Sequence, residues 1–427
     1  MDTTPLALGI DLGSSGMRLA LVTAADPGAE QPLAEETGPY PREFNEPQGW
    51  REGLMALVQR LPAGWRGRIR ALAVDGTSGT LLLCRNDGTL GSGSIGQALP
   101  YHQACLDQAP KAAALAGSGP AASASGSLAR ALTLLELAAG TGQAGPWLLR
   151  HQADWLMGWL LGDWRWGEEG NNIRLGWDLE QQRWQGSIAD QVWRDALPQI
   201  RPSGTVLGPL GAEAAASIGL PADCLVVAGS TDANAAVLAA QPGDHDGVTV
   251  LGTTLVLKQW HTAPISAAGV SSHRIGGRWL VGGASNAGGG LLRRFFNDAQ
   301  LVELSRQIDP ERPSGLQLRP LPAPGERFPV EDPALAPILE PRPVSDALYL
   351  QGLLEGLAAI EAAGWRRLAA LGAPPVQRVI SLGGGAVNPQ WRRLRERKLG
   401  IPVLNRPRCS AALGMARLAA SALPSPR

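Results

Sequence analysis

Residues 9–16 read GIDLGSSG, a glycine-rich turn between two apolar stretches, and MRLALV follows it at residues 17–22. MRLALV alternates in hydrophobicity and suits a strand, so we expect a β-hairpin over residues 7–23 rather than a strand followed by a helix. The turn lacks both the GxxxxGK[ST] pattern and the GxGxxG spacing. The sequence therefore predicts a hairpin turn that offers backbone N–H groups to a phosphate.

Three polar side chains of this turn indicate what it binds. Ser14 and Ser15 add hydroxyl donors, whereas Asp11 at the end of the first strand would repel a phosphate. A cation between the two groups would remove that repulsion, so Asp11 is a candidate for holding Mg²⁺, directly or through water. The alternative is an ordinary turn at the end of a strand.

The same arrangement recurs twice, as IRALAVDGTSGTLLLC at residues 69–84 and as VTVLGTTLVLK at residues 248–258. Each copy places small or hydroxyl residues between apolar strands. Copies in both halves of the chain predict two related domains, each with a sheet, although pieces this short also arise by chance.

Three stretches have helical spacing, at residues 127–139, 151–162 and 347–371, with Ser127 as the expected N-cap of the first. Residues 319–343 contain eight prolines and cannot form a regular element. We expect a structured loop or a crossover there.

The composition favours a globular protein of two domains, with 427 residues, 44% of them hydrophobic. The 38 basic and 38 acidic residues cancel, so nothing indicates binding to nucleic acid or to an anionic membrane. No signal segment and no membrane-spanning run is present, which predicts a soluble cytoplasmic protein with reduced thiols. The four cysteines lack zinc-ligand spacing; they are Cys84, Cys105, Cys224 and Cys409.

A candidate acid or base follows another strand, in AGSTDANAAVLAA at residues 228–240. Ser230 and Thr231 suit a helix N-cap, which places Asp232 in the first helical turn. A carboxylate there complements the helix dipole. Alternatively it serves as the general base of a kinase, where positioning matters more than a raised pKa.

The stretch VISLGGGAVNPQWRRL, residues 379–394, reads as a strand that ends in three glycines, with a helix starting near Asn388 or Pro389. Bare glycine backbone lets a flat ring or a phosphate approach closely, and Trp391 could flank an adenine. The alternative is an ordinary tight turn between a strand and a helix.

Taken together and in this order, the motifs resemble those of the FGGY carbohydrate kinases, in the actin/hexokinase-like superfamily. Besides GIDLGSSG and GSTDANAA, the resemblance rests on VDGTSGT (74–80), VLGTT (250–254), GERFP (325–329), LLEG (353–356) and GGGAVN (383–388). With ASNAGGG at residues 284–290, the chain is most similar to the short cyanobacterial and plant plastid members. Those members resemble xylulose kinases and are expected to act on D-ribulose.

The resemblance implies an α/β fold of two actin/hexokinase-like (ribonuclease H-like) domains with an interdomain cleft. The expected parts are an N-terminal, sugar-side domain at residues 1–239, a C-terminal, nucleotide-side domain at 240–410, and a helix within 411–427 that packs back on the first domain.

The resemblance also implies roles for individual residues. Asp232 becomes the catalytic base, Asp11 the metal-side carboxylate, and Ser14 and Ser78 hydroxyls that face the sugar or the γ-phosphate. The residues implied for ATP are Gly13, Ser15, Gly252, Thr253, Thr254, Gly384, Gly385, Asn388 and Trp391.

The implied activity is phosphorylation of D-ribulose to D-ribulose 5-phosphate with ATP and Mg²⁺, by a monomer or homodimer. D-Xylulose, L-ribulose and glycerol are the alternative substrates, and a non-catalytic sugar or ATP sensor is the alternative class. Many members carry W-x-D-x-R near the sugar, where this chain has LPYHQACLD at residues 99–107. Xylulose kinases often have Gln-Met-His where this chain has Gly-Thr-Ser, so the sugar stays open.

Overall fold

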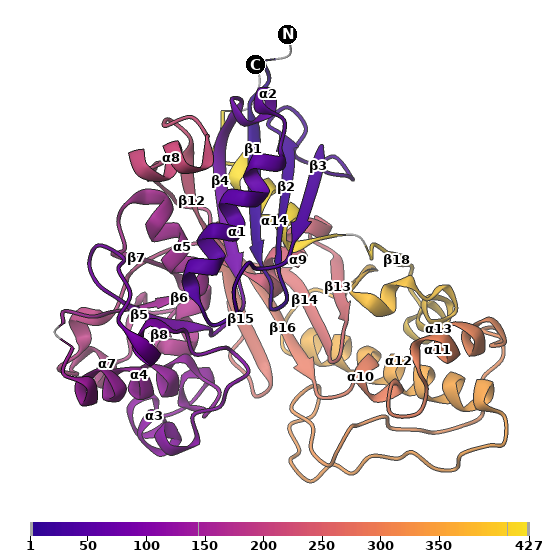
Figure 1. Ribbon diagram of the computed structural model, residues 1–427. Helices are drawn as coiled ribbons and strands as arrows, with labels where there is room; N and C mark the ends of the chain where they lie inside the picture. Colours follow the sequence, from indigo (N-terminus) through magenta and orange to yellow (C-terminus); the bar gives the residue numbers. More distant parts are fainter. Residues whose placement is uncertain (1–2, 144, 408, 425–427) are drawn as a thin grey trace. The chain divides into compact units, whose positions relative to one another are not determined.

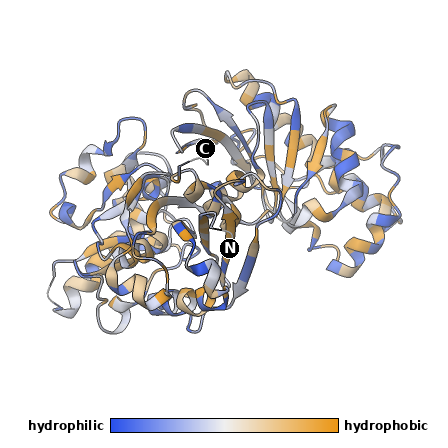
Figure 2. Ribbon diagram, turned by 90° about the horizontal axis from the view of Figure 1, so that it is seen from above, coloured by the Kyte–Doolittle hydropathy of each residue, from blue (hydrophilic) through white to orange (hydrophobic). Residues whose placement is uncertain are grey.

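Two six-stranded sheets organise the chain (Figure 1). The computed structural model describes residues 3–424 apart from 144 and 408. Unit 1 contains the residues up to Ala239, Arg274–Gly277 and the residues from Ser410 onward, and unit 2 contains Ala240–His273 and Arg278–Cys409. Figure 2 shows hydrophobic residues along the strands of both units, as expected for sheets that form the cores.

The sheet of unit 1 has the order β11-β12-β4-β1-β2-β3. Its three middle strands, β12, β4 and β1, run parallel, and the outer pairs are antiparallel. The strands are β1 Leu6–Leu12, β2 Met17–Thr23, β3 Ala34–Gly38, β4 Ile69–Gly76, β11 Val206–Pro209 and β12 Leu225–Thr231. Three two-stranded sheets complete the unit: β5 Leu81–Cys84 with β6 Leu148–His151, β7 Trp166–Glu168 with β10 Gln199–Arg201, and β8 Trp177–Asp178 with β9 Arg183–Trp184.

The hairpin predicted from residues 7–23 is confirmed, because β1 pairs antiparallel with β2 from Leu6↔Thr23 to Leu12↔Met17. The second predicted copy, at residues 69–84, is wrong as a hairpin. Strand β4 pairs with β1 and β12, whereas β5 leaves this sheet and pairs with β6. Both strands exist, but their partners come from distant parts of the chain, which local pattern does not specify.

Helices pack on both faces of the first sheet. Side chains of α1, α5 and α8 join the apolar core on one face, and α14 lies along β1, β2 and β4 on the other. A Cβ atom on Gly9 would lie 1.8 Å from the carbonyl oxygen of Ala412, so this glycine permits the close approach of α14. The helices of unit 1 are α1 Pro47–Arg60, α2 Ala63–Arg66, α3 Ala109–Ala116, α4 Ser127–Thr141, α5 Gln152–Leu161, α6 Glu169–Asn172, α7 Gly186–Ala189, α8 Ala212–Ile218, α9 Asp232–Ala240, which ends at the boundary with unit 2, and α14 Ala411–Ala420.

The sheet of unit 2 has the order β15-β16-β14-β13-β17-β18. The hairpin predicted at residues 248–258 is confirmed by the antiparallel pair β13–β14. The strands are β13 Asp246–Leu251, β14 Leu255–His261, β15 Val270–Ile275, β16 Arg278–Ser285, β17 Arg378–Leu382 and β18 Val403–Asn405. The helices are α10 Gly289–Leu292, α11 Asp298–Arg306, α12 Asp346–Ala370 and α13 Pro389–Leu399.

The three predicted helices are present as α4, α5 and α12, and residues 319–343 contain no helix or strand. The predicted N-cap is wrong: Gly126 occupies the cap position of α4, and Ser127 is its first helical residue. The Ser127 hydroxyl instead contacts the ring of His151 at 2.8 Å. That partner is distant in sequence, and its contact replaces the local cap.

Candidate functional site

Three aspartates stand at the carboxyl ends of three neighbouring parallel strands of unit 1. In the register of the sheet, Asp11 on β1 is opposite Asp75 on β4, and Ser230 on β12 is opposite Asp75 on the other side. Asp232 follows β12 as the first residue of α9. Ligands of open α/β sheets bind at this edge, so the topology gathers the candidate acids where a ligand is expected.

Asp75 is a site residue that the sequence analysis missed. Its side chain is fully buried, and neither carboxylate oxygen accepts a hydrogen bond from a described N–H or O–H donor. Burial, followed by the charges of Asp11 and Asp232, raises the pKa of Asp75 well above its ordinary value. The signal available in the sequence was its place at the end of an apolar strand, but the partner strand was unknown.

Asp11 faces Asp75 across the two strands. Burial raises the pKa of Asp11, while the neighbouring Asp75 carboxyl and the charge of Arg18 oppose that rise. Two adjacent carboxyls in a buried setting are stable only when a proton or a cation lies between them.

The carboxyl pair Asp11–Asp75 fits a divalent cation. Mg²⁺ uses one or two protein carboxylates and completes its shell with water and phosphate oxygens. Across the described part of the chain, no set of three or more His, Cys, Asp or Glu side chains is arranged to hold a metal by itself. The unpartnered oxygens of Asp75 beside Asp11 therefore suit a metal whose remaining ligands come from a nucleotide.

Asp232 lies within reach of a hydroxyl from the neighbouring turn. Its Oδ1 accepts the backbone N–H of Ala233 at 2.8 Å and the hydroxyl of Ser78 at 3.4 Å. Burial raises the pKa of Asp232, the Ala233 N–H opposes that rise, and the charge of Asp11 adds to it. A half-buried carboxylate with a raised pKa is a stronger base than an exposed one, as proton abstraction requires.

The turn after β4 has one hydroxyl that is accessible to a ligand, while its threonine hydroxyls form hydrogen bonds within the protein. Thr77 donates its N–H and hydroxyl to Gln152 Oε1 at 3.1 and 2.8 Å, and its hydroxyl also contacts that of Thr80 at 2.6 Å. Ser78 alone among the hydroxyl residues of the turn is only partly buried. Gly79 has φ +104°, a conformation that glycine adopts without strain.

The turn of GIDLGSSG exposes both of its serines. Ser14 and Ser15 are exposed. The Tyr40 hydroxyl donates a hydrogen bond to the carbonyl oxygen of Gly13 at 2.7 Å and so fixes the start of the turn. Gln152 Nε2 lies 3.5 Å from the same Tyr40 hydroxyl. Tyr40 and Gln152 therefore connect this turn to the turn at Thr77.

In unit 2, the turn Gly252, Thr253 and Thr254 joins β13 to β14 and is partly exposed. Two glycines of the segment 284–290 donate backbone N–H groups to it, Gly289 to Gly252 at 2.9 Å and Gly290 to Thr253 at 3.1 Å. These glycines explain the composition of the segment, since side chains there would collide with the turn.

The glycine turn after β17 borders a hollow of about 600 Å³. The hollow is lined by Ala386, Val387, Pro389, Arg392, Asn405 and Pro407. Gly384 is exposed and Gly385 half-buried, so their backbone is open to a ligand. The helix expected to start near Asn388 is present as α13, and Asn388 is its N-cap. The Asn388 side-chain amide also donates to the Ser305 hydroxyl at 2.8 Å. The indole of Trp391 is 2% exposed and packs in the core of unit 2, not at the surface.

Solved structures establish the class of fold. A xylulose kinase from Bifidobacterium adolescentis superposes with a TM-score of 0.77 at 20% identity, covering 98% of this chain and 93% of that one. A glycerol kinase from Plasmodium falciparum, solved with ADP, gives 0.77 at 13% identity, covering 97% and 89%. The chain thus has the two-domain actin/hexokinase-like fold, as expected.

The family model is more specific. Residues 247–423 match the C-terminal domain of the FGGY family of carbohydrate kinases. An autoinducer-2 kinase from Yersinia enterocolitica serotype O:8 / biotype 1B is 26% identical over 291 residues, which are 61% of this chain and 54% of that protein. The chain therefore aligns with about half the length of this curated relative. Residues 247–423 therefore resemble the C-terminal domain of that family, and the fold of the whole chain resembles that of a solved sugar kinase.

No described helix is long and apolar enough to span a bilayer.

Proposed function

We propose that the protein is an ATP-dependent sugar kinase that phosphorylates the terminal hydroxyl of a ketopentose, D-ribulose giving D-ribulose 5-phosphate. The observation that carries the proposal is the group formed by Asp232, its neighbour Ser78 and the carboxyl pair Asp11–Asp75, at one edge of one sheet. A carboxylate beside a hydroxyl site and a metal site is what phosphoryl transfer to an alcohol requires.

In this mechanism the residues of unit 1 place the acceptor and receive its proton. Ser78 hydrogen-bonds the sugar, and Asp232 accepts the proton of the attacking hydroxyl as the new P–O bond forms. Asp11 and Asp75 would hold Mg²⁺, which neutralises charge on the transferred phosphoryl group. Backbone N–H groups and the hydroxyls of the turn at residues 13–16 contact phosphate oxygens.

Residues of unit 2 bind the nucleotide in the same proposal. The turn at Gly252, Thr253 and Thr254 contacts ATP phosphates, and the glycine backbone at Gly384 and Gly385 borders the base beside the hollow of unit 2. Asn388 shapes this turn by capping α13. Because the Trp391 ring is buried in the core, we assign it to packing and leave the base contact to the glycines.

Xylulose, glycerol and autoinducer-2 are named for the similar proteins, so the substrate is tested on a panel. The panel contains D-ribulose, D-xylulose, L-ribulose and glycerol, each in an ADP-release assay with ATP and Mg²⁺. We expect the highest kcat/KM for D-ribulose. Turnover with another polyol, and none with D-ribulose above the rate without sugar, would overturn the substrate while keeping the kinase.

Asp232→Asn separates the kinase from a non-catalytic sensor of sugar or ATP. Loss of a general base lowers kcat by about 10²- to 10⁴-fold. The matched control is Asp195→Asn, whose carboxylate is exposed in the same unit. Equal activity of the Asp232→Asn variant and the control would refute the assigned base. We further propose a cytoplasmic monomer or homodimer, and the balanced charge supports the absence of nucleic-acid and membrane partners.

A further inference from the structure

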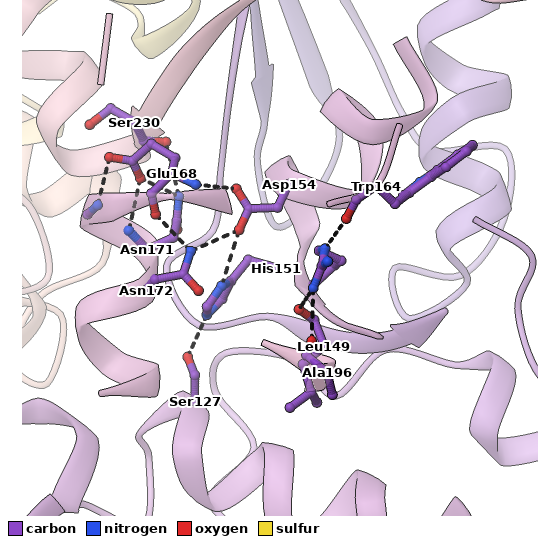
Figure 3. A network of polar contacts seen from close by, with 12 residues as sticks. Ser127, Leu149, His151, Asp154, Trp164, Glu168, Asn171, Asn172, Ala196 and Ser230 are labelled. Atoms are coloured by element: carbon purple, nitrogen blue, oxygen red, sulfur yellow. Dashed lines mark hydrogen bonds and ion pairs between the residues drawn. The ribbon is translucent and has the colours of Figure 1, made fainter. Parts of the chain in front are cut away.

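A buried polar network reaches Ser230, two residues before Asp232 in the chain (Figure 3). It draws side chains from the start of α4, the junction of β6 and α5, the end of β7 and the short helix α6, and it ends at β12. Its polar side chains are all less than 3% exposed. The members are Ser127, His151, Asp154, Glu168, Asn171, Asn172 and, through its carbonyl, Ser230.

One end of the network has the Ser–His–Asp order of a hydrolytic triad, but its serine is not accessible to a substrate. Ser127 Oγ lies 2.8 Å from His151 Nε2, and His151 Nδ1 lies 3.5 Å from Asp154 Oδ2. Ser127 is fully buried, so no substrate carbonyl can reach its hydroxyl. Ser127 and His151 therefore serve to hold the Asp154 carboxylate in place.

Asp154 in turn fixes the segment that follows it in the network. Its Oδ1 accepts the backbone N–H of Glu168 at 2.9 Å, and its Oδ2 accepts the amide of Asn172 at 3.1 Å. Glu168 accepts the N–H groups of Gly170 and Asn171 at 2.7 and 2.9 Å and so caps α6.

Asn171 links this segment to β12 by a side-chain hydrogen bond. Its Nδ2 donates to Glu168 Oε2 at 3.1 Å and to the carbonyl of Ser230 at 3.4 Å. Ser230 is two residues before Asp232 and is opposite Asp75 in the sheet. A displacement of that carbonyl would therefore move the junction at which β12 ends and α9 begins.

We propose that Asn171 is a positioning residue for Asp232. Glu168 fixes the side-chain amide of Asn171, and that amide holds the carbonyl of Ser230. Asn171 thereby sets the direction in which the Asp232 carboxylate points from the β12–α9 junction toward Ser78. The inference rests on the proposed function, since it concerns the base of that reaction. A misplacement of a reacting group by about 1 Å costs on the order of 10²-fold in rate, so a contact of this kind has a measurable effect.

The test compares Asn171 with its neighbour Asn172. Both amides are buried, but Asn172 donates to Asp154 and to the Glu168 carbonyl and not to β12. We expect Asn171→Ala to lower kcat by about tenfold or more, with the KM values for sugar and ATP within twofold of wild type. Asn172→Ala should lower the melting temperature similarly and leave kcat within twofold. Asn171→Leu keeps a similar volume and removes the donor without placing a second carboxyl beside Glu168, so it should reproduce the loss in kcat if the Ala variant folds poorly.

Hydrogen exchange gives a readout that does not depend on activity. Backbone amides of residues 230–234 should exchange at least about tenfold faster in Asn171→Ala and at the wild-type rate in Asn172→Ala. Equal exchange and equal kcat in the two variants would overturn the inference. Wild-type protein without turnover on any sugar would refute the proposed function, while the exchange comparison would still decide whether Asn171 holds this junction.

Discussion

The hydroxyl of Tyr40 offers a single-atom test of how the turn at residues 13–16, which we propose to contact phosphate, is held in place. It donates to the carbonyl oxygen of Gly13 at 2.7 Å and approaches Gln152 Nε2 at 3.5 Å. Burial, together with the negative charges of Asp11 and Asp75, raises the pKa of Tyr40, so the group remains a donor at any working pH. Tyr40→Phe removes that donor and retains the ring, which contacts Phe44.

The expected size follows from one hydrogen bond in a partly buried setting. Such a bond contributes about 0.5–1.5 kcal/mol, and 1 kcal/mol corresponds to about fivefold in a binding or rate constant. Without the hydrogen bond from Tyr40, the turn at Gly13 would have to become ordered when phosphate binds, and the free energy of that ordering would weaken binding. We therefore expect kcat/KM for ATP to fall about three- to tenfold, mainly through KM, with a small decrease in melting temperature.

Tyr349→Phe is the matched control. Tyr349 is 1% exposed and lies in unit 2, and its hydroxyl donates to the carbonyl of Leu339 at 2.9 Å. Steady-state kinetics at varied ATP and thermal unfolding would be measured for both variants. The control should lose stability without a change in KM. If Tyr40→Phe behaves in the same way, the hydroxyl is only structural and the reasoning about the turn is refuted.

Three further predictions concern stability. Because the pKa of Asp75 is raised in the folded state, its contribution to stability is complete below its unfolded pKa and is lost as pH rises. In EDTA, Asp75→Asn should therefore unfold at a higher temperature than wild type at pH 8, and the difference should shrink toward pH 4. A difference that does not depend on pH would contradict this. Arg395 binds the fully buried carboxylate of Glu361 at 2.6 and 2.7 Å, so Arg395→Met leaves that carboxylate without its cation. The free energy of unfolding, measured by chemical denaturation, should fall by about 3–5 kcal/mol. Adding Glu361→Leu should restore most of the lost stability. Gly9→Ala would place a Cβ atom 1.8 Å from the carbonyl of Ala412, so we expect a loss of about 1–3 kcal/mol or more, with increased proteolysis of α14 as the second measurement.

Elements with a strong local pattern were predictable. The hairpins at residues 7–23 and 248–258 alternate in hydrophobicity on each side of a small-residue turn, and both are present as β1–β2 and β13–β14. The helix at residues 347–371 repeats its apolar positions over many turns and is present as α12 Asp346–Ala370. In these cases neighbours in the sequence are also neighbours in space, so pattern and structure agree.

Predictions failed where a residue has a distant partner. The pairing of β5 with β6 joins residues near 83 to residues near 149, and no local pattern specifies it. The Ser127 hydroxyl bonds His151 and leaves the cap position to Gly126. The role of Asp75 was invisible for the same reason, since it depends on which strands flank β4.

The amino-acid sequence by itself predicted the hairpins at residues 7–23 and 248–258 and the helices present as α4, α5 and α12. Through the resemblance of its ordered motifs it also predicted a two-domain carbohydrate kinase, with Asp11 beside the metal and Asp232 as the base. Only the tertiary structure decided that β1, β4 and β12 are adjacent and parallel, which brings Asp75 between those two aspartates, and that Asn171 contacts the strand leading to Asp232. The physical reason is that hydrophobic periodicity reports the face of a strand that is buried, whereas the order of strands depends on packing between segments far apart in the chain.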